Sequence, residues 1–458
     1  MSDPVLGAFS KVVVDYETSW GVAKGSPTGF HIPVTTCALA PSQSLIPNPT
    51  LTGDLSERDP AFGPIAATGN LVKVADLVTF PFFTQLLCGN LAGAGAGPNY
   101  THTSKISSNM PLSAVVETSW NLAVPQYSKA SGVRIQTMTI PIDSTGFLST
   151  TYALEAKTVT IGTTPYSAGS VAVAAADLLS GTLAPSNNDT VQAGSVVYTF
   201  KTTLTGAANE VLIGGTGSAA DALYNLASAI NAGDDIGVTY GTGTTANADV
   251  SASTLTSSSL LCVAKVAGVA GNSLGALHAV GSHLTWSHAT TFTGGVDAGS
   301  LTDWTTSASS PFDGLQLQSA DCKIGGSAVG YISKGSISIA AGLGGSDYRV
   351  GSGGARGSLV PSVYKVTGSL DLALDSSAVL ALIASASTPV SLDFTWTQAA
   401  GSTFQIIIPR AFISRTGPAL TGPGAIMVTA QFNAAFDTAT QTSCEFITSN
   451  QTTNAAYT

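Results

Sequence analysis

Charged side chains are scarce in this sequence of 458 residues. They make up 10% of the chain, against about 25% in an average soluble domain. The net charge is −10 and no long basic run occurs, which argues against a nucleic-acid-binding protein that grips phosphates. Because interface cores are depleted in charge, this scarcity favours a protein that other subunits cover over a β protein that is merely poor in charge.

Paired cysteines, an export signal and a membrane-spanning run are also missing. The N-terminal region holds Asp3, Asp15 and Glu17 and no apolar segment of the signal-peptide type. The uncharged stretch 158–176 contains Pro165 and two glycines, so we expect no membrane span there. The cysteines are odd in number, scattered and without a CxxC pair, which predicts buried free thiols in a protein folded in a reducing cytoplasm: Cys37, Cys88, Cys262, Cys322 and Cys444.

A repeat is present instead. The stretch TGNLVKVAD at 68–76 returns as TGSLDLALD at 367–375. A short apolar segment that predicts a helix follows each stretch, LVTFPFFTQLLCG after the first and SSAVLALIASA (376–386) after the second. Pro81 and Gly89 mark the expected start and end of the first helix. The second helix has an N-cap candidate in Asp375 or Ser376.

The segments around these stretches repeat as well. Before each TG comes a loop rich in Gly, Pro and charge (56–67 and 346–362), and before each loop an alternating strand candidate. Downstream, GFLSTTYALEAK resembles GAIMVTAQFNAA, and a further strand candidate precedes each. The first copy has a longer middle loop, NLAGAGAGPNYTHTS at 90–104. The order predicts two copies of one β-sheet-plus-helix module.

Residues 177–299 differ in character and predict a small α+β domain inserted between the copies. VVYTFKTTL (196–204), LLCVAKV (260–266) and HLTW (283–286) are typical of strands. SAADALYNLASAINA (218–232) predicts an amphipathic helix with Ser218 as its N-cap. We therefore expect three parts: a first module at 1–176, a surface-exposed inserted domain at 177–299, and a second module with a C-terminal tail at 300–458.

No motif predicts catalysis, a cofactor or a metal. GNSLG at 271–275 matches the G-x-S-x-G pattern, but no helical pattern follows it and no acidic residue lies between Ser273 and the next histidines. His278, His283 and His288 are five residues apart, a spacing that puts neighbours on opposite faces of a strand. The glycine runs AGAGAG (92–97) and GLGG (342–345) lack the spacing of phosphate loops and predict flexible loops.

Arg58, Arg349 and Arg356 are candidate contacts between subunits or rings. In a chain with few charges, all three fall in the matching loops before TG. Arginine suits polar contacts between subunits, because its planar guanidinium binds carboxylates through two hydrogen bonds. Solvated loop charges are the alternative interpretation.

The two copies resemble the tail tube (major tail) proteins of long-tailed bacteriophages. The resemblance rests on the ordered set of IPVTTCALA, the arginine-bearing loop, TG-x-L with its helix, and the hairpin that ends in GFLSTTYALEAK or GAIMVTAQFNAA. It implies a mainly β fold of two tandem β-sandwich or β-roll modules, each with a flanking helix. The insert is similar to domains within phage virion proteins.

The resemblance also implies the function of a structural virion protein of the phage tail, made in the host cytoplasm. Modules would pair edge to edge into rings, and rings would stack into the tube through which DNA passes. Rings of six modules imply three chains, a trimer with pseudo-sixfold symmetry. The implied partners are the tape measure protein and DNA in the lumen, tail tip and terminator proteins at the tube ends, and a host surface for the insert.

Three alternatives remain open at this point. A secreted adhesin or surface-layer protein would also be β-rich and acidic, but it predicts an export signal. Another virion component, such as a decoration or baseplate protein, predicts discrete particles in place of open-ended tubes. A hydrolase built on Ser273 predicts an activity that Ser273→Ala abolishes.

Overall fold

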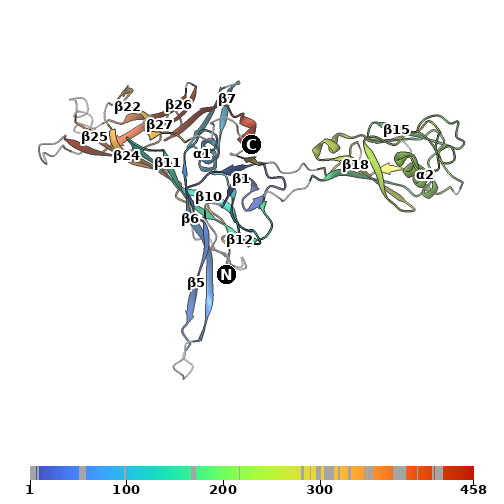
Figure 1. Cartoon of the computed structure of the whole chain (residues 1–458), viewed down its shortest axis with the longest axis horizontal. Coiled ribbons are helices and arrows are strands. Elements are labelled where there is room, and N and C mark those ends of the chain that lie inside the picture. Colours follow the sequence, from blue (N-terminus) through green and yellow to red (C-terminus); the bar gives the residue numbers. More distant parts are fainter. Residues whose placement is uncertain are drawn as a thin grey trace. The chain divides into compact units, whose positions relative to one another are not determined.

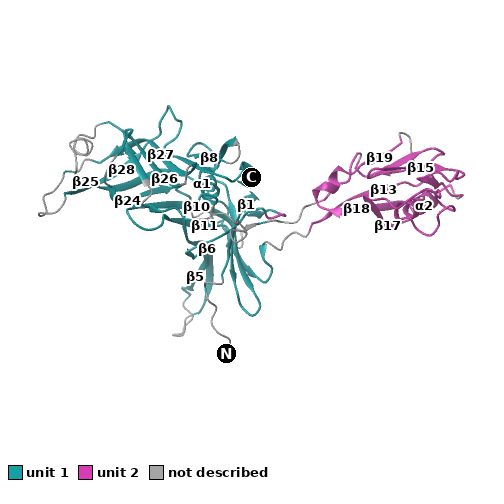
Figure 2. Cartoon of the chain, turned by 45° about the horizontal axis from the view of Figure 1, so that its top comes forward, with its two compact units in different colours: residues 1–24, 28–166, 301–458 teal, residues 25–27, 167–300 magenta. Residues whose placement is uncertain are grey.

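The structure is a computed structural model in which the chain divides into two compact units, coloured separately in Figure 2. Unit 1 comprises 1–24, 28–166 and 301–458, and unit 2 comprises 25–27 and 167–300. The fold is mainly β, as the sequence predicts. The structure describes residues 7, 10–50, 58–96, 99–166, 172–215, 217–279, 283–288, 290–295, 301–303, 314–317, 320–328, 332–344, 348, 354–374, 388–399, 401–414, 417 and 426–457.

The repeat seen in the sequence is a repeat of strand order in unit 1. Each copy pairs six strands in the same antiparallel sequence. In the first copy the order is β5 (Ala40–Asn48), β6 (Arg58–Val74), β11 (Ser149–Ala156), β10 (Gln126–Asp143), β9 (Ala114–Trp120) and β1 (Val12–Ser19). In the second it is β24 (Ile332–Ala340), β25 (Lys365–Ala373), β28 (Met427–Ala434), β27 (Ser402–Ile413), β26 (Val390–Ala399) and β22 (Ala320–Ile324).

The glycine of each TG stretch is explained by a close approach of two strands. A Cβ on Gly69 would lie 2.1 Å from the Ala38 carbonyl oxygen, and one on Gly368 would lie 2.3 Å from that of Ser336. Gly69 pairs with Leu154, and Gly368 pairs with Phe432 at the matching position of the second copy. The motif that reveals the repeat is therefore a packing requirement that both copies share.

The first predicted helix is confirmed as α1, Phe80–Cys88. Proline occupies its first turn, and Gly89 closes it in the left-handed conformation at φ 73°. Its apolar side chains are buried, and Phe80 lies 3.9 Å from the ring of Phe404 in β27. Helix α1 thus packs against the second copy as well as its own. The second predicted helix, 376–386, lies outside the described residues.

The two copies share one hydrophobic core. Buried residues of both, from Val12 to Tyr457, belong to a single cluster. The pairings of the described strands of unit 1 also join into one closed barrel. It includes the short strands β2 (Val22–Ala23), β3 (Phe30–Ile32), β4 (Thr36–Cys37), β7 (Ala92–Ala96), β8 (Asn99–Lys105), β12 (Thr158–Gly162), β21 (Thr302–Asp303), β23 (Ser327–Ala328) and β29 (Glu445–Asn450).

Two predicted loops are wrong in part. Residues 58–67 belong to strand β6. Pro60 and Pro64 lack amide donors and are tolerated there, because residues 58–66 pair with β5 alone among the described strands. Residues 92–96 of the AGAGAG run form strand β7, paired with β8. Glycine suits this strand, since a Cβ on Gly93 would collide with the side chain of Asn454.

Unit 2 holds two four-stranded sheets and helix α2, Ala219–Asn231. Ser218 caps the helix as predicted, accepting a hydrogen bond from the Ala220 amide. The three predicted strands are confirmed as β15, β18 and β20. The sheets contain β17 (Val250–Leu255), β18 (Ser259–Ala267), β13 (Ala174–Ser180) and β20 (Thr285–Trp286), and β16 (Glu210–Leu212), β15 (Val196–Lys201), β14 (Thr190–Ala193) and β19 (Ala276–His278).

Candidate functional site at the junction of the repeats

Strand β10 joins the two copies. Near its start it pairs with β9 and β12, and nearer its end with β11 and β24. The contact with β24 runs from Thr137 opposite Ala340 to Asp143 opposite Lys334, and β24 is the first strand of the second copy's sheet. The sheet of one copy therefore continues into the sheet of the next through backbone hydrogen bonds.

A junction loop from the second copy reinforces this contact. We give this name to the described residues 341–344, 348 and 354–364. The Arg356 guanidinium forms an ion pair with Glu155 on β11, and its Nε donates to the Tyr348 hydroxyl at 3.3 Å. Arg134 on β10 donates to the Leu359 carbonyl. Both arginines therefore fix the junction loop to the first copy.

Because Arg356 is buried, its charge needs the carboxylate of Glu155 as a partner. Arg356 is only 5% exposed. Burial opposes its charge, but the hydrogen bonds with Tyr348 and Glu155 still raise the pKa of the guanidinium above its ordinary value. A buried arginine of this kind depends on its carboxylate, because an unpaired buried charge is costly.

The three candidate arginines lie in different settings. Arg356 lies at the junction just described, Arg58 is an exposed residue at the start of β6, and Arg349 lies outside the described residues. Their role between subunits remains a prediction. Sequence reasoning missed Glu155 and Arg134, which hold the junction loop. Comparing the copies could have found them, because the repeat carries no charge at their matching positions.

The matching segment of the first copy forms an arm. The arm consists of residues 43–48 and 58–65, a two-stranded hairpin of β5 and β6 that leaves the sheet in Figure 1. Every residue of β5 is exposed, and Phe62 is 76% exposed. A two-stranded hairpin alone is marginally stable in water. An exposed apolar hairpin is therefore a candidate interface.

A groove of about 610 Å³ lies at the edge of the first copy's sheet. Its lining includes residues 33–37, Lys11, Thr118 and Trp120. Strand β4 forms part of this wall, and among the described strands it pairs with β6 alone. In the second copy, the strand at this place is β24, and β10 covers its edge. The groove thus lies at the edge of the first copy that corresponds to the edge of β24, which β10 covers in the second copy.

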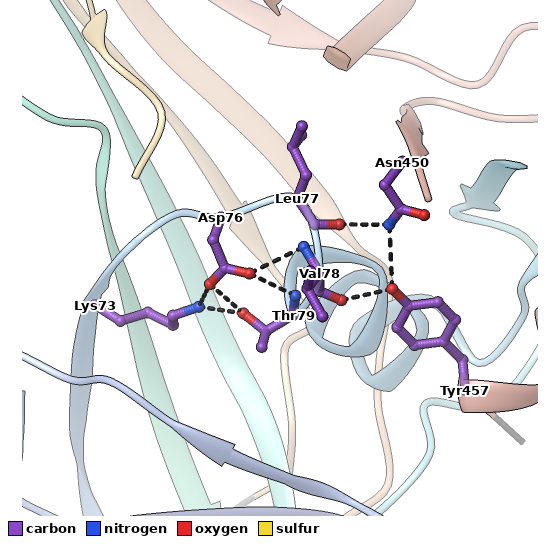
Figure 3. A network of polar contacts seen from close by, with 7 residues as sticks. All are labelled: Lys73, Asp76, Leu77, Val78, Thr79, Asn450 and Tyr457. Atoms are coloured by element: carbon purple, nitrogen blue, oxygen red, sulfur yellow. Dashed lines mark hydrogen bonds and ion pairs between the residues drawn. The ribbon is translucent and has the colours of Figure 1, made fainter. Parts of the chain in front are cut away.

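A buried polar network fixes the start of α1 (Figure 3). Lys73, only 1% exposed, forms an ion pair with Asp76 and donates to the Thr79 hydroxyl. Asp76 accepts hydrogen bonds from the amides of Val78 and Thr79 at 2.9 and 2.7 Å. The network replaces a conventional N-cap, because Thr79 makes no capping hydrogen bond with its own side chain.

The C-terminal segment continues this anchor (Figure 3). The Tyr457 hydroxyl donates to the Val78 carbonyl at 2.6 Å, and the Asn450 amide donates to the Leu77 carbonyl at 2.6 Å. Strand β29, which carries Asn450, pairs with β8 of the first copy. The C-terminal residues of the second copy thus hold α1 of the first.

Three residues that match parts of enzyme motifs have structural partners: Ser273, His283 and His288. Ser273 ends a short 3₁₀ helix and donates to the Ala270 carbonyl, so the strand–turn–helix of an esterase is not formed there. His283 contacts the Ala184 carbonyl, and His288 contacts Asp177 at 3.0 Å. Among the described residues, no three metal-ligating side chains gather. None of the described helices is both long and apolar enough to cross a membrane.

These features define a structural β protein whose repeated modules join through strand edges and interlocking loops. A family model for phage tail tube proteins matches residues 7–434, nearly the whole chain. The chain therefore belongs to the phage tail tube protein family. It is a structural protein of the virion tail, made in the host, and it assembles into the tube. No curated protein matches it.

Proposed function

We propose that three chains close into a ring of six modules and that these rings stack into the tail tube. The observation that supports this is the β10–β24 pairing, which joins two modules within one chain. A junction that works once within the chain can work again between chains, since the modules repeat. A head-to-tail interface of this kind forms a closed ring when the rotation from one module to the next closes.

On the first copy, the edge that would pair in the proposed junction is formed by β4 and the beginning of β5. Thr36 pairs with Val72 as Lys334 pairs with Asp371, so residues 36–42 match the edge 334–340 that β10 covers. That edge borders the groove of about 610 Å³. The positions of the second copy that match 137–143 are 415–421, and of these the structure describes Gly417 alone, which lies in no strand.

The ring size rests on the six modules that the family resemblance implies. The further partners are proposals on the same basis: DNA and the tape measure protein in the lumen, tail tip and terminator proteins at the tube ends, and a host surface for unit 2. The net charge of −10 supports the passage of DNA, because a basic wall would bind phosphates and slow it.

Cryo-electron microscopy of the purified full-length chain tests the proposal. We expect stacked rings with threefold symmetry in which each chain fills two positions. Rings with sixfold symmetry of whole chains would overturn the trimer and keep the tube. Chains that stay monomeric at high concentration, with tail components added, would overturn the proposed assembly.

A further inference from the structure

The outer faces of the two copies differ in exposure at matching positions. Side chains that alternate outward on β11 are half-buried, and their counterparts on β28 are all exposed. The first row is Ser149, Thr151, Ala153 and Glu155, and the second row is Met427, Thr429, Gln431 and Asn433. The first row carries the ion pair with Arg356 of the junction loop. The second row has no comparable cover among the described residues.

The register shows which residues correspond. Thr68 pairs with Glu155, and Thr367 pairs with Asn433, so Asn433 stands where Glu155 stands. Across the next strand, Glu155 pairs with Arg134 and Asn433 pairs with Phe412. The two charged side chains that hold the junction loop are therefore replaced in the second copy by an amide and an exposed aromatic ring.

The arm also carries exposed apolar side chains, whereas the junction loop makes a charged contact with the first copy. Its exposed apolar side chains include Leu45, Ile46 and Phe62. Leu45 and Phe62 are direct cross-strand partners, so they lie on one side of the hairpin. Phe412 is 42% exposed, with Arg410 against its ring at 5.4 Å. In one copy, Arg356 of the junction loop meets Glu155. In the other, the exposed apolar side chains of the arm correspond to a mainly polar row whose exposed apolar members are Met427 and the neighbouring Phe412.

We propose that the arm of one chain covers the second row and Phe412 of a neighbouring copy of the same chain. The arm then takes the place that the junction loop takes on the first copy. Phe62 and Leu45 bury their side chains against Phe412 and Met427, whose exposed fraction is 43%. The proposal rests on the ring assembly proposed above and names the surface that the arm binds there.

The test uses two single variants of the full chain, Phe62→Asp on the arm and Phe412→Asp on the face. Burying one phenylalanine side chain contributes enough to shift an association constant about 10- to 100-fold. We expect each variant to need at least that much more protein to assemble, measured by light scattering. Val197→Asp is the control, since Val197 is an exposed apolar residue of unit 2. Thermal unfolding midpoints should match the unaltered chain throughout.

Mixing the two variants distinguishes a joint surface from two separate ones. The Phe62→Asp chain keeps its face and the Phe412→Asp chain keeps its arm, so the mixture retains one intact contact. At protein concentrations at which each variant alone is monomeric, we expect the mixture to form dimers by light scattering. A mixture that stays monomeric would overturn the pairing of these surfaces.

Two other outcomes also overturn this inference. One is assembly of either variant at the ordinary concentration. The other is threefold rings of Phe62→Asp that fail to stack, which would place the arm between rings. The proposed ring itself fails only if the unaltered chain forms no threefold rings, so the two failures are distinguishable.

Discussion

The segments that precede the two TG stretches occupy the same place in the repeat and have opposite structures. In the first copy the segment is the arm, an exposed hairpin of β5 and β6 whose Ile65, at its base, exchanges hydrogen bonds with Tyr348 and Gly354 of the junction loop. In the second it is the junction loop, held on the first copy by Arg356, Arg134 and Tyr348. The junction loop is thus bound within the chain, and the arm is the segment proposed above to bind another chain.

The strands beneath these segments did not diverge in the same way. Gly69 and Gly368 each lie against the backbone carbonyl at the matching position of their own copy, Ala38 for the first and Ser336 for the second. Segments at the surface can change partners, whereas the paired strands are constrained by close packing on both sides. The comparison therefore separates a scaffold that both copies share from surface segments that specify which module binds which.

The largest expected effect is on the shared scaffold. Gly69→Val and Gly368→Val each force a side chain into a backbone carbonyl, so each should destabilise the chain by about 3 kcal/mol or more. Gly162→Val is the control, because a Cβ there meets nothing within 4 Å. Denaturant unfolding measures the change. A large loss in only one of the two glycine variants would show that the copies do not share this constraint.

The next largest loss of stability is expected at the buried Lys73–Asp76 ion pair of the first copy, where the second copy has no matching lysine. Lys73 is buried beside Asp76, and the matching residue of the second copy is Leu372. Asp76→Ala leaves an unpaired buried ammonium and should cost about 3–5 kcal/mol. Adding Lys73→Leu removes that charge and should restore much of the loss in denaturant unfolding. A double variant no more stable than Asp76→Ala would contradict a charge-pair origin.

The sequence predicts some features of the fold and the junction, and it does not predict others. The first helix follows from a local pattern that needs no partner, and the TG stretches are visible because they recur in the sequence. The partners of Glu155 and Arg134 could not be predicted, because they depend on a loop far away in the chain. The loop predicted for residues 56–67 is wrong from Arg58 onward. Prolines and glycines are typical of loops, yet a strand that pairs on one side tolerates them.

A smaller effect is expected at the junction loop. Glu155→Gln removes the ion pair of Arg356 and should destabilise unit 1 by about 1–3 kcal/mol, because Arg356 is buried. Glu445→Gln removes the more exposed pair with Lys105 and should change stability by about 1 kcal/mol or less. A double-mutant cycle with Arg356→Met isolates the coupling. Equal effects of the two glutamine variants would show that the junction loop adds nothing to the fold.

The smallest effect is expected when unit 2 is removed. Tyr166 and Leu301, which flank it in the sequence, pack in the same small apolar cluster of unit 1, so a short Gly-Ser linker can replace 167–300. The main core of unit 1 contains no residue of unit 2. We therefore expect the shortened chain to unfold within about 1 kcal/mol of the intact one and to form the same rings by electron microscopy. Loss of rings from a chain that still folds would make unit 2 part of the tube wall, and the contrast between arm and junction loop would no longer suffice to explain assembly.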